Sequence, residues 1–164
     1  MANLKILTIP NPILKQTCAS VENISDDVVK LVNDMQDTMN NSCHCVGIAA
    51  SQVGILVRIV VVNVSLNPKP HRNSGLLIMI NPVITYASGK LKSREGCLSV
   101  PDFTGNVSRN DKITIEYLDI KGTKKILKTS GFESIVIQHE IDHLNGIVFL
   151  DKVSSLKTDI FKRV

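Results

Sequence analysis

The chain has 164 residues, of which 43% are hydrophobic, and it carries a formal net charge of +4. This size predicts a single domain over residues 1–164, with a hydrophobic core large enough to stabilise the fold without disulfides or other cross-links. No apolar run approaches the length that a helix needs to span a bilayer. The densest lysine group, at 121–128, has no interleaved aromatic residues, so we expect a solvated hairpin face and no nucleic-acid site.

The first residues of the chain lack both the apolar core of a signal peptide and the pattern of a transit peptide. We therefore expect a cytoplasmic protein, or a mature organellar form whose presequence is absent. The cysteines are Cys18, Cys43, Cys45 and Cys97. An intracellular chain of this size does not need them as disulfides, so each thiol requires its own interpretation.

The N-terminal half predicts an arm, a helix and a segment of small residues. Residues 1–24 are interrupted by prolines and indicate an extended arm. The segment 25–40 begins with a serine and two aspartates and keeps its apolar residues on one face, which predicts an amphipathic helix. In 45–54 the small residues allow close approach to a partner and Gln52 lies among them, although a tight turn explains this segment equally well.

Strands are expected to dominate the middle of the chain. The β-branched run 55–64 predicts a buried strand. The other strands are expected at 76–80 and 83–86, broken at Asn81-Pro82, and in a hairpin formed by 112–118 and 125–128.

A second helix is predicted over residues 130–145. Ser130 and Glu133 have the spacing of a capping box, and Gly146 supplies the stop. Apolar residues occur on all sides of this helix, so we expect it to be buried. A short C-terminal helix is expected at 154–161. The fold class is therefore α+β, with mostly antiparallel sheets around a central buried helix, an N-terminal amphipathic helix and a short C-terminal helix.

The central helix contains the sequence His-Glu-x-x-His. His139 and His143 are four residues apart and project from the same helical face, where two imidazoles can bind one transition-metal ion. Glu140 beside them can act as a base toward a metal-bound water. The pattern indicates metal-assisted hydrolysis, whereas two core histidines without a metal are the alternative.

A catalytic site of this kind usually has a third protein ligand. Downstream of His143 only Asp151 and Asp159 are carboxylates, so upstream residues are better candidates. Cys97 is favoured because Gly96 gives the backbone room and because Glu95 and Ser99 can provide supporting hydrogen bonds. The alternative is a buried free cysteine that binds no metal. The other upstream candidates are His71, Cys43, His44, Cys45 and Cys18.

Three segments together extend this interpretation. Gly-Ile-Ala-Ala-Ser-Gln at 47–52, Glu-Gly-Cys-Leu-Ser at 95–99 and Gln-His-Glu-Ile-Asp-His at 138–143 occur in this order. Together they resemble the three motifs of the peptide deformylases. Three motifs are far more specific than one, and the resemblance covers nearly the whole chain.

The resemblance implies one metal ion bound by Cys97, His139 and His143. The expected ion is Fe²⁺, for which Ni²⁺, Co²⁺ or Zn²⁺ can substitute. The implied reaction is removal of the N-formyl group from the formylmethionine that begins newly made polypeptides, with release of formate.

The resemblance also assigns roles in that reaction. Metal-bound water would be the nucleophile, and Glu140 would act as general base and then as general acid. The metal, the Gln52 amide and the backbone N–H of Leu98 would stabilise the charge on the formyl oxygen. The substrate would be extended and would bind the enzyme as an added strand, with an apolar pocket for its methionine. The implied substrate-binding residues are Val46, Gly47, Glu95, Gly96 and Ile135.

Two departures from the family pattern affect the cleft. Cys45 occupies a position where the family often has glycine; we expect the chemistry to remain intact, with a changed pocket shape or a route to oxidation. The segment 101–105 lacks an arginine that many members carry, so the resemblance does not assign substrate contacts to this segment. For Arg109, the nearest arginine that follows, a purely structural role is the alternative to substrate contact.

The expected partners are N-formylmethionyl nascent peptides, with no direct nucleic-acid or membrane partner, and the expected state is a monomer. Transient ribosome contact is a further expectation, for which Lys157, Lys162 and Arg163 provide positive charge. Three alternatives remain: a general metallopeptidase, an inactive family member, and a closed structural metal site. The last would need a fourth ligand from Cys43, His44 or Cys45.

Overall fold

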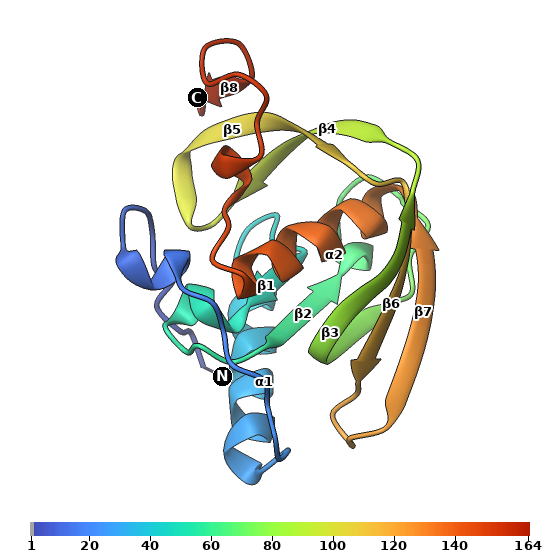
Figure 1. Ribbon diagram of the computed structural model, residues 1–164. Coiled ribbons are helices and arrows are strands. Elements are labelled where there is room, and N and C mark those ends of the chain that lie inside the picture. Colours follow the sequence, from blue (N-terminus) through green and yellow to red (C-terminus); the bar gives the residue numbers. More distant parts are fainter. Residues whose placement is uncertain (1) are drawn as a thin grey trace.

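The computed structural model describes residues 2–164 as an α+β fold built from two antiparallel sheets and two α-helices (Figure 1). The five-stranded sheet has the order β1 (Gly47–Ala49), β2 (Ile59–Asn63), β3 (Leu76–Ser88), β6 (Lys112–Leu118) and β7 (Lys124–Ser130). The three-stranded sheet has the order β4 (Leu91–Cys97), β5 (Val100–Arg109) and β8 (Ile160–Lys162). The α-helices are α1 (Asp26–Asn40) and α2 (Gly131–Leu144), and the 3₁₀ helices are η1 (Pro12–Lys15), η2 (Ala50–Val53), η3 (Val64–Leu66) and η4 (Phe149–Asp151).

Helix α1 covers the outer side of β1 and β2. Its first turn is capped by Ser25, whose Oγ accepts a hydrogen bond from the backbone N–H of Val28 at 3.4 Å. Its buried face packs into a cluster with Ile48, Ile59 and Val61, which fixes the β1 strand and the η2 turn beneath the cleft described below. The buried residues of α1 are Val32, Met35, Thr38 and Met39.

Helix α2 lies between the two sheets (Figure 1). Its apolar residues Ile137, Ile141 and Leu144 pack against the five-stranded sheet in one core cluster. Nearly every residue from Glu133 to Leu144 is buried. The opposite side of α2 therefore faces the three-stranded sheet, and His139 and His143 project toward β4.

The predicted interruption at Asn81-Pro82 is wrong, because β3 runs continuously through it. Asn81 adopts a left-handed backbone with φ of 52°, and the pairing with β6 shifts register there. The Asn81 amide exchanges two hydrogen bonds of 2.8 Å with the backbone of Val21. The N-terminal arm thus supports a kink that the sequence pattern alone presents as a strand end.

The predicted C-terminal helix at 154–161 is also wrong. The chain forms a turn, in which Asp159 accepts a hydrogen bond from the Ser155 N–H at 3.1 Å, and then strand β8. Strand β8 pairs with β5, with Ile160 opposite Gly105. The apolar spacing that predicted a helix instead reflects a short strand against an existing sheet edge.

Among residues 2–164, no helix is long and apolar enough to cross a membrane.

Candidate active site

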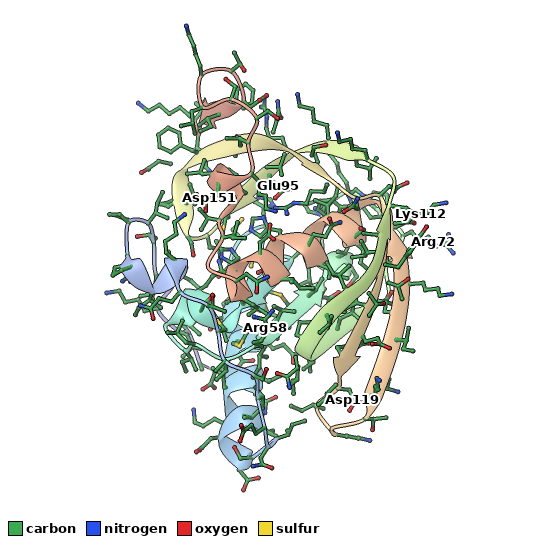
Figure 2. The ribbon with its side chains drawn as sticks, viewed as in Figure 1. Arg58, Arg72, Glu95, Lys112, Asp119 and Asp151 are labelled. Atoms are coloured by element: carbon green, nitrogen blue, oxygen red, sulfur yellow. The ribbon has the colours of Figure 1, made fainter. Side chains whose placement is uncertain are left out.

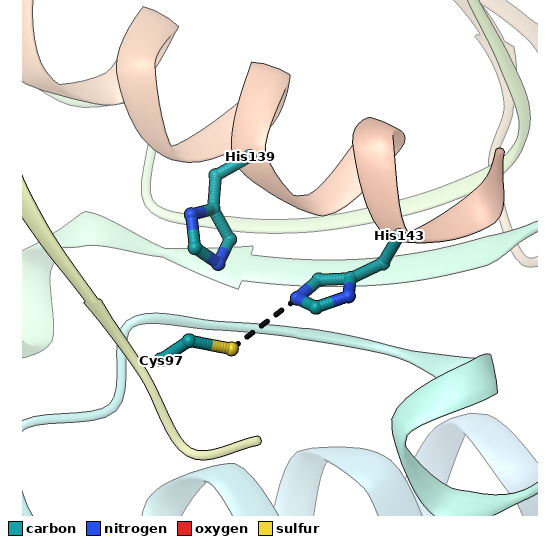
Figure 3. A group of neighbouring side chains, drawn as sticks. All are labelled: Cys97, His139 and His143. Atoms are coloured by element: carbon teal, nitrogen blue, oxygen red, sulfur yellow. Dashed lines mark hydrogen bonds between the residues drawn. The ribbon is translucent and has the colours of Figure 1, made fainter. Parts of the chain in front are cut away.

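The three residues predicted as metal ligands meet between α2 and β4 (Figure 3). One ligand atom from each of Cys97, His139 and His143 lies within 4.8 Å of the others, and all three residues are buried. The Cys97 Sγ is 3.3 Å from the Nε2 of His143. A thiolate and two imidazoles form a donor set that suits iron, zinc, cobalt or nickel.

A cleft of about 480 Å³ opens beside this group. It is bordered by β1, β4 and the side of α2 that carries His139 and Glu140, so it brings together residues from all three motifs. Every residue predicted for the site lines this cleft except His143, which is fully buried behind it. The lining predicted residues are Val46, Gly47, Gln52, Glu95, Gly96, Cys97, Leu98, Ile135, His139 and Glu140.

Gln52 is held in a single orientation by its neighbours. Its Oε1 accepts a hydrogen bond from the backbone N–H of Ala49 at 2.9 Å. Its Nε2 donates to Ser99 Oγ at 3.1 Å and to Cys97 Sγ at 3.3 Å. The amide NH₂ therefore faces the Cys97 group, where it can donate to a bound oxygen atom.

Glu140 lies in the same cleft with an unpaired atom. The residue is 4% exposed, and its Oε2 is buried without a hydrogen-bond partner. Burial raises the pKa of Glu140 to about 7, with the charge of Glu95 adding to the shift and that of His139 opposing it. A buried, unpaired carboxylate oxygen is costly unless a polar group binds there.

Gly47 allows Glu140 to occupy this place. A Cβ atom at Gly47 would lie 2.8 Å from the Glu140 Oε1 and 3.0 Å from a Val136 methyl group. No side chain can therefore replace the hydrogen at this position without displacing the carboxylate. Within the segment 45–54, Gly47 therefore has a packing reason in the cleft.

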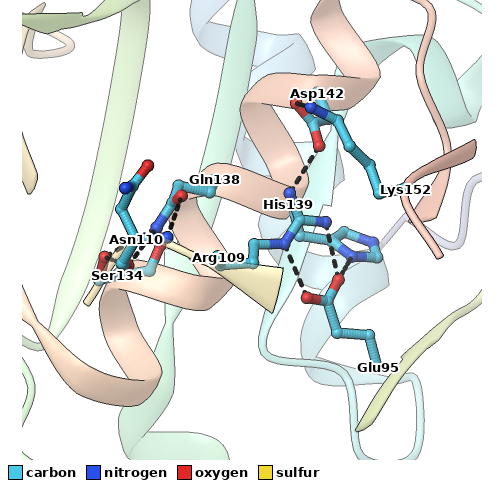
Figure 4. Close-up of polar contacts among 8 residues, drawn as sticks. All are labelled: Glu95, Arg109, Asn110, Ser134, Gln138, His139, Asp142 and Lys152. Atoms are coloured by element: carbon cyan, nitrogen blue, oxygen red, sulfur yellow. Dashed lines mark hydrogen bonds and ion pairs between the residues drawn. The ribbon is translucent and has the colours of Figure 1, made fainter. Parts of the chain in front are cut away.

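A buried ion-pair network supports His139 (Figure 4). Arg109 donates to both Glu95 oxygens, at 2.7 and 2.8 Å, and to Asp142 at 2.6 Å. Glu95 Oε1 is in turn 2.8 Å from the Nδ1 of His139. This carboxylate fixes the ring so that the other imidazole nitrogen is free for the group containing Cys97.

The network also determines ionisation in the site. Burial raises the pKa of Glu95, but the hydrogen bonds from Arg109 and His139 outweigh burial and hold that pKa below its usual value. Burial and the neighbouring charge of His139 hold the pKa of His143 well below its usual range. Burial lowers the pKa of His139 too, but contacts with Cys97 and Glu95 outweigh it and raise that pKa. The raised pKa favours a proton on His139, and a cation bound by these residues would replace that proton. The chemistry of the donor set therefore fits a metal ion.

The first half of α2 is held by a second polar group, formed by Ser134 and Gln138 with Asn110. The Gln138 side chain accepts from the backbone N–H of Asn110 at 3.1 Å and donates to the Asn110 carbonyl at 2.8 Å (Figure 4). Ser134 donates to the same carbonyl at 2.9 Å. These bonds link α2 to the turn after β5 and hold its histidines at a fixed depth.

The remaining cysteine and histidine candidates are not part of the metal-ligand group. Within residues 2–164, Cys97, His139 and His143 are the only set of three or more such side chains close enough to share an ion. Cys43, His44 and Cys45 line the cleft, but Cys45 donates its S–H to the Gly47 carbonyl at 3.2 Å. His71 stacks on Phe132, with ring centroids 4.3 Å apart.

Sequence reasoning did not assign a site role to Arg109 or Asp142. Both are remote from Glu95 in the sequence, and a lone arginine at a strand end carries no motif. It also did not place Arg94, Thr104 or Arg163 at the cleft. These residues reach it through the pairing of β4, β5 and β8, which sequence periodicity did not reveal.

The α+β fold, the cleft and the buried Cys-His-His group beside a carboxylate define a hydrolase with a candidate metal centre. Three comparisons with known proteins make this more specific. The sequence profile of the polypeptide deformylase family matches residues 3–159. The chain belongs to the polypeptide deformylase family, and it is therefore an enzyme, a hydrolase.

Relatives and solved structures agree over nearly the full length. The chain is 39% identical over 163 residues to the peptide deformylase of Thermodesulfovibrio yellowstonii, covering 99% of this chain and 96% of the relative. It is 41% identical over 164 residues to that of Helicobacter hepaticus, covering 99% and 90%. The Ehrlichia chaffeensis peptide deformylase structure matches with a TM-score of 0.87 and 39% identity, covering 95% and 90%. A Met-Ala-Ser-bound structure of the Acinetobacter baumannii enzyme matches with a TM-score of 0.86 and 35% identity, covering 93% and 99%.

Proposed function

We propose that this enzyme removes the formyl group from the N-terminal formylmethionine of newly made polypeptides by metal-assisted hydrolysis. The observation that carries the proposal is the buried group of Cys97, His139 and His143 with the unpaired Glu140 Oε2 beside it in one cleft. The solved relative that binds Met-Ala-Ser supports a peptide beginning with methionine as the product.

Cys97, His139 and His143 would hold the ion, and Glu95 would keep His139 oriented. When bound there, a divalent ion supplies a Lewis acid and lowers the pKa of water. We propose Fe²⁺, with Ni²⁺, Co²⁺ or Zn²⁺ as substitutes, because one thiolate and two imidazoles accept all of these ions.

Glu140 takes a proton from the attacking water and returns it to the leaving amine, so that one carboxylate serves as base and then acid. The Gln52 NH₂ group and the Leu98 backbone N–H donate to the formyl oxygen as charge develops on it. Because Gln52 is already fixed by Ala49 and Ser99, it needs no reorganisation during the reaction.

The peptide lies extended between the two strands that border the cleft. Its backbone pairs with Val46 and Gly47 on one side and with Glu95 and Gly96 on the other, as an added strand. Ile135 and the ring of His139 form walls of the methionine pocket.

The test is formate release from formyl-Met-Ala-Ala under anaerobic conditions, using protein loaded with Fe²⁺ or Ni²⁺. Glu140→Gln keeps the shape of the side chain and removes the base, so turnover should fall by roughly 10²-fold or more, while the bound ion is retained. Acetyl-Met-Ala-Ala is the substrate control, and metal analysis of wild type and variant is the protein control.

Rapid formate release by the wild type alone, with the acetyl peptide intact, is the expected result. Cleavage of internal peptide bonds instead would establish a metallopeptidase. An ion bound by four protein ligands, without turnover of any formyl peptide, would establish a closed structural site.

We also propose that residues 1–164 act as one catalytic unit in a cytoplasmic or organellar compartment, as a monomer with transient ribosome contact. The family match over residues 3–159 supports the single unit. Sedimentation of the purified protein, alone and with ribosomes, tests the oligomeric state and the contact.

A further inference from the structure

Strand β8 brings a positive charge to the mouth of the cleft. Phe161 pairs with Thr104 of β5, and the Arg163 N–H donates to the Asp102 carbonyl at 2.8 Å. Because side chains alternate along a strand, Phe161 and Arg163 share one face of the sheet and Lys162 occupies the other. Arg163 accordingly lines the cleft.

The Arg163 guanidinium lies directly over Gly96. A methyl group on Gly96 would overlap the Nη2 of Arg163, and it would lie 3.5 Å from a Thr104 methyl group. Gly96 immediately precedes Cys97, so this cation lies next to the path of a peptide that pairs with β4. At about 3.3 Å per residue, an extended peptide that pairs with β4 and has its formyl group at Cys97 brings its second and third residues beside Glu95 and Arg94. Acidic side chains there lie between the Arg94 side chain and the Arg163 guanidinium over Gly96.

A second arginine lies on the same sheet face. The Arg94 guanidinium is 3.7 Å from the centroid of the Phe161 ring, a cation–π contact that orients it. Arg94 also lines the cleft. Within residues 2–164, no carboxylate lies within ion-pair distance of Arg94 or Arg163, so both charges are available to a ligand.

The carboxylates of the cleft do not neutralise this pair. Glu95 is bound by Arg109 and His139 on the opposite side of β4, and Glu140 is buried beside Gly47. The mouth of the cleft is therefore cationic, and a planar guanidinium binds a carboxylate through two parallel hydrogen bonds.

We propose that Arg163, with Arg94 beside it, forms an anion subsite that favours nascent peptides with aspartate or glutamate at the second or third residue. The proposal rests on the proposed deformylase function and adds a specificity-determining residue to it. The subsite acts on substrate binding, so it changes KM more than kcat.

The test compares four formyl peptides with amidated C-termini, so that the side chain carries the only carboxylate. The peptides are formyl-Met-Ala-Ala, formyl-Met-Glu-Ala, formyl-Met-Ala-Glu and formyl-Met-Lys-Ala. We expect kcat/KM of the wild type for at least one glutamate peptide to exceed that for the alanine peptide by roughly threefold or more, and the lysine peptide to be poorer. The preference should shrink at high salt.

Arg163→Met should remove this preference while turnover of the alanine peptide persists, and Arg163→Lys should restore part of it. Lys162→Met removes an equal charge from the opposite face of the same strand and is the matched control, for which the preference should remain.

Equal kcat/KM for acidic and neutral peptides in the wild type would overturn the subsite and leave the deformylase function intact. An acidic preference that survives Arg163→Met, or disappears equally in Lys162→Met, would also overturn it. Absence of turnover for all four peptides would overturn the deformylase function and the subsite together.

Discussion

At the scale of single residues, Cys43 and Cys45, the two cleft cysteines outside the candidate ligand group, differ sharply in environment. Cys43 is exposed, whereas Cys45 is 8% exposed and donates to the Gly47 carbonyl. Burial, reinforced by the charge of Glu140, raises the pKa of Cys45 to about 12. The thiolate is the reactive form, so Cys45 offers a poor route to oxidation and acts mainly on the shape of the pocket.

We therefore predict that iodoacetamide at pH 8 modifies Cys43 and leaves Cys45 unmodified, because a pKa about four units above the pH leaves roughly one thiolate in 10⁴. Peptide mapping by mass spectrometry on the metal-loaded enzyme measures both sites. Cys43→Ser is the control and should abolish rapid labelling. Labelling of Cys45 at a rate similar to that of Cys43 would contradict the prediction.

The residues that we propose to carry the chemistry could be named from the sequence because each belongs to a short motif with fixed spacing. The residues that support them could not. Glu95 was assigned to substrate contact, yet its buried carboxylate joins Arg109 to His139. In the pairing of β4 with β5, Arg109 is opposite Leu91 and Glu95 is opposite Gly105, so the Arg109 side chain must reach along the sheet to Glu95. Local sequence patterns do not encode that contact.

At the scale of elements, the end of α2 is defined by a close contact with another segment. Gly146 follows the helix with φ of 72°, and a Cβ atom there would lie 2.5 Å from the Lys15 carbonyl oxygen. The helix therefore ends where η1 crosses it. Gly75 has a similar φ of 73°, but nothing lies within 4 Å of its Cβ position.

These two glycines provide a matched pair of substitutions. We predict that Gly75→Ala costs about 1 kcal/mol, the penalty for a left-handed alanine, and that Gly146→Ala costs at least about 1 kcal/mol more, because the backbone of η1 must move. Urea unfolding followed by circular dichroism measures both. Equal urea midpoints for the two variants would show that the η1 backbone moves without a loss of free energy of unfolding, which would contradict the prediction.

Elements were predictable where the local pattern is long, as in the one-sided apolar face of α1, the apolar residues all round α2 and the alternation of the β6–β7 hairpin. They were not predictable where a partner strand decides the conformation. Strand β8 has three residues and exists because the edge of β5 is available, and β3 continues through Asn81 because Val21 satisfies its amide. Both features depend on contacts between distant segments, which local propensity cannot supply.

At the scale of the whole molecule, the candidate metal centre joins two layers. Cys97 belongs to the three-stranded sheet, whereas His139 and His143 belong to α2, which packs on the five-stranded sheet. Figure 2 shows Glu95 in the same region, between β4 and α2. A bound ion therefore connects the layers and should stabilise the native state relative to the unfolded chain.

We predict that removing the ion with a chelator lowers the melting temperature. An ion present at 100 times its Kd contributes about 2.7 kcal/mol, or roughly 5–10 °C for a protein of this size. Calorimetry with and without chelator measures the shift, and Cys97→Ser is the control, since it should show a much smaller one. An unchanged melting temperature for a wild type shown to have lost its ion would contradict the prediction.

The separation of Cys97 from the two histidines along the chain has a consequence for synthesis of the enzyme itself. A growing polypeptide that has not yet reached His139 carries one of the three ligands and lacks the helix that fills the space between the sheets. The centre can be assembled only after α2 has been translated and has docked. If the proposed function holds, each copy is inert while it is being made, and it can act on other chains only when its own translation has passed His143.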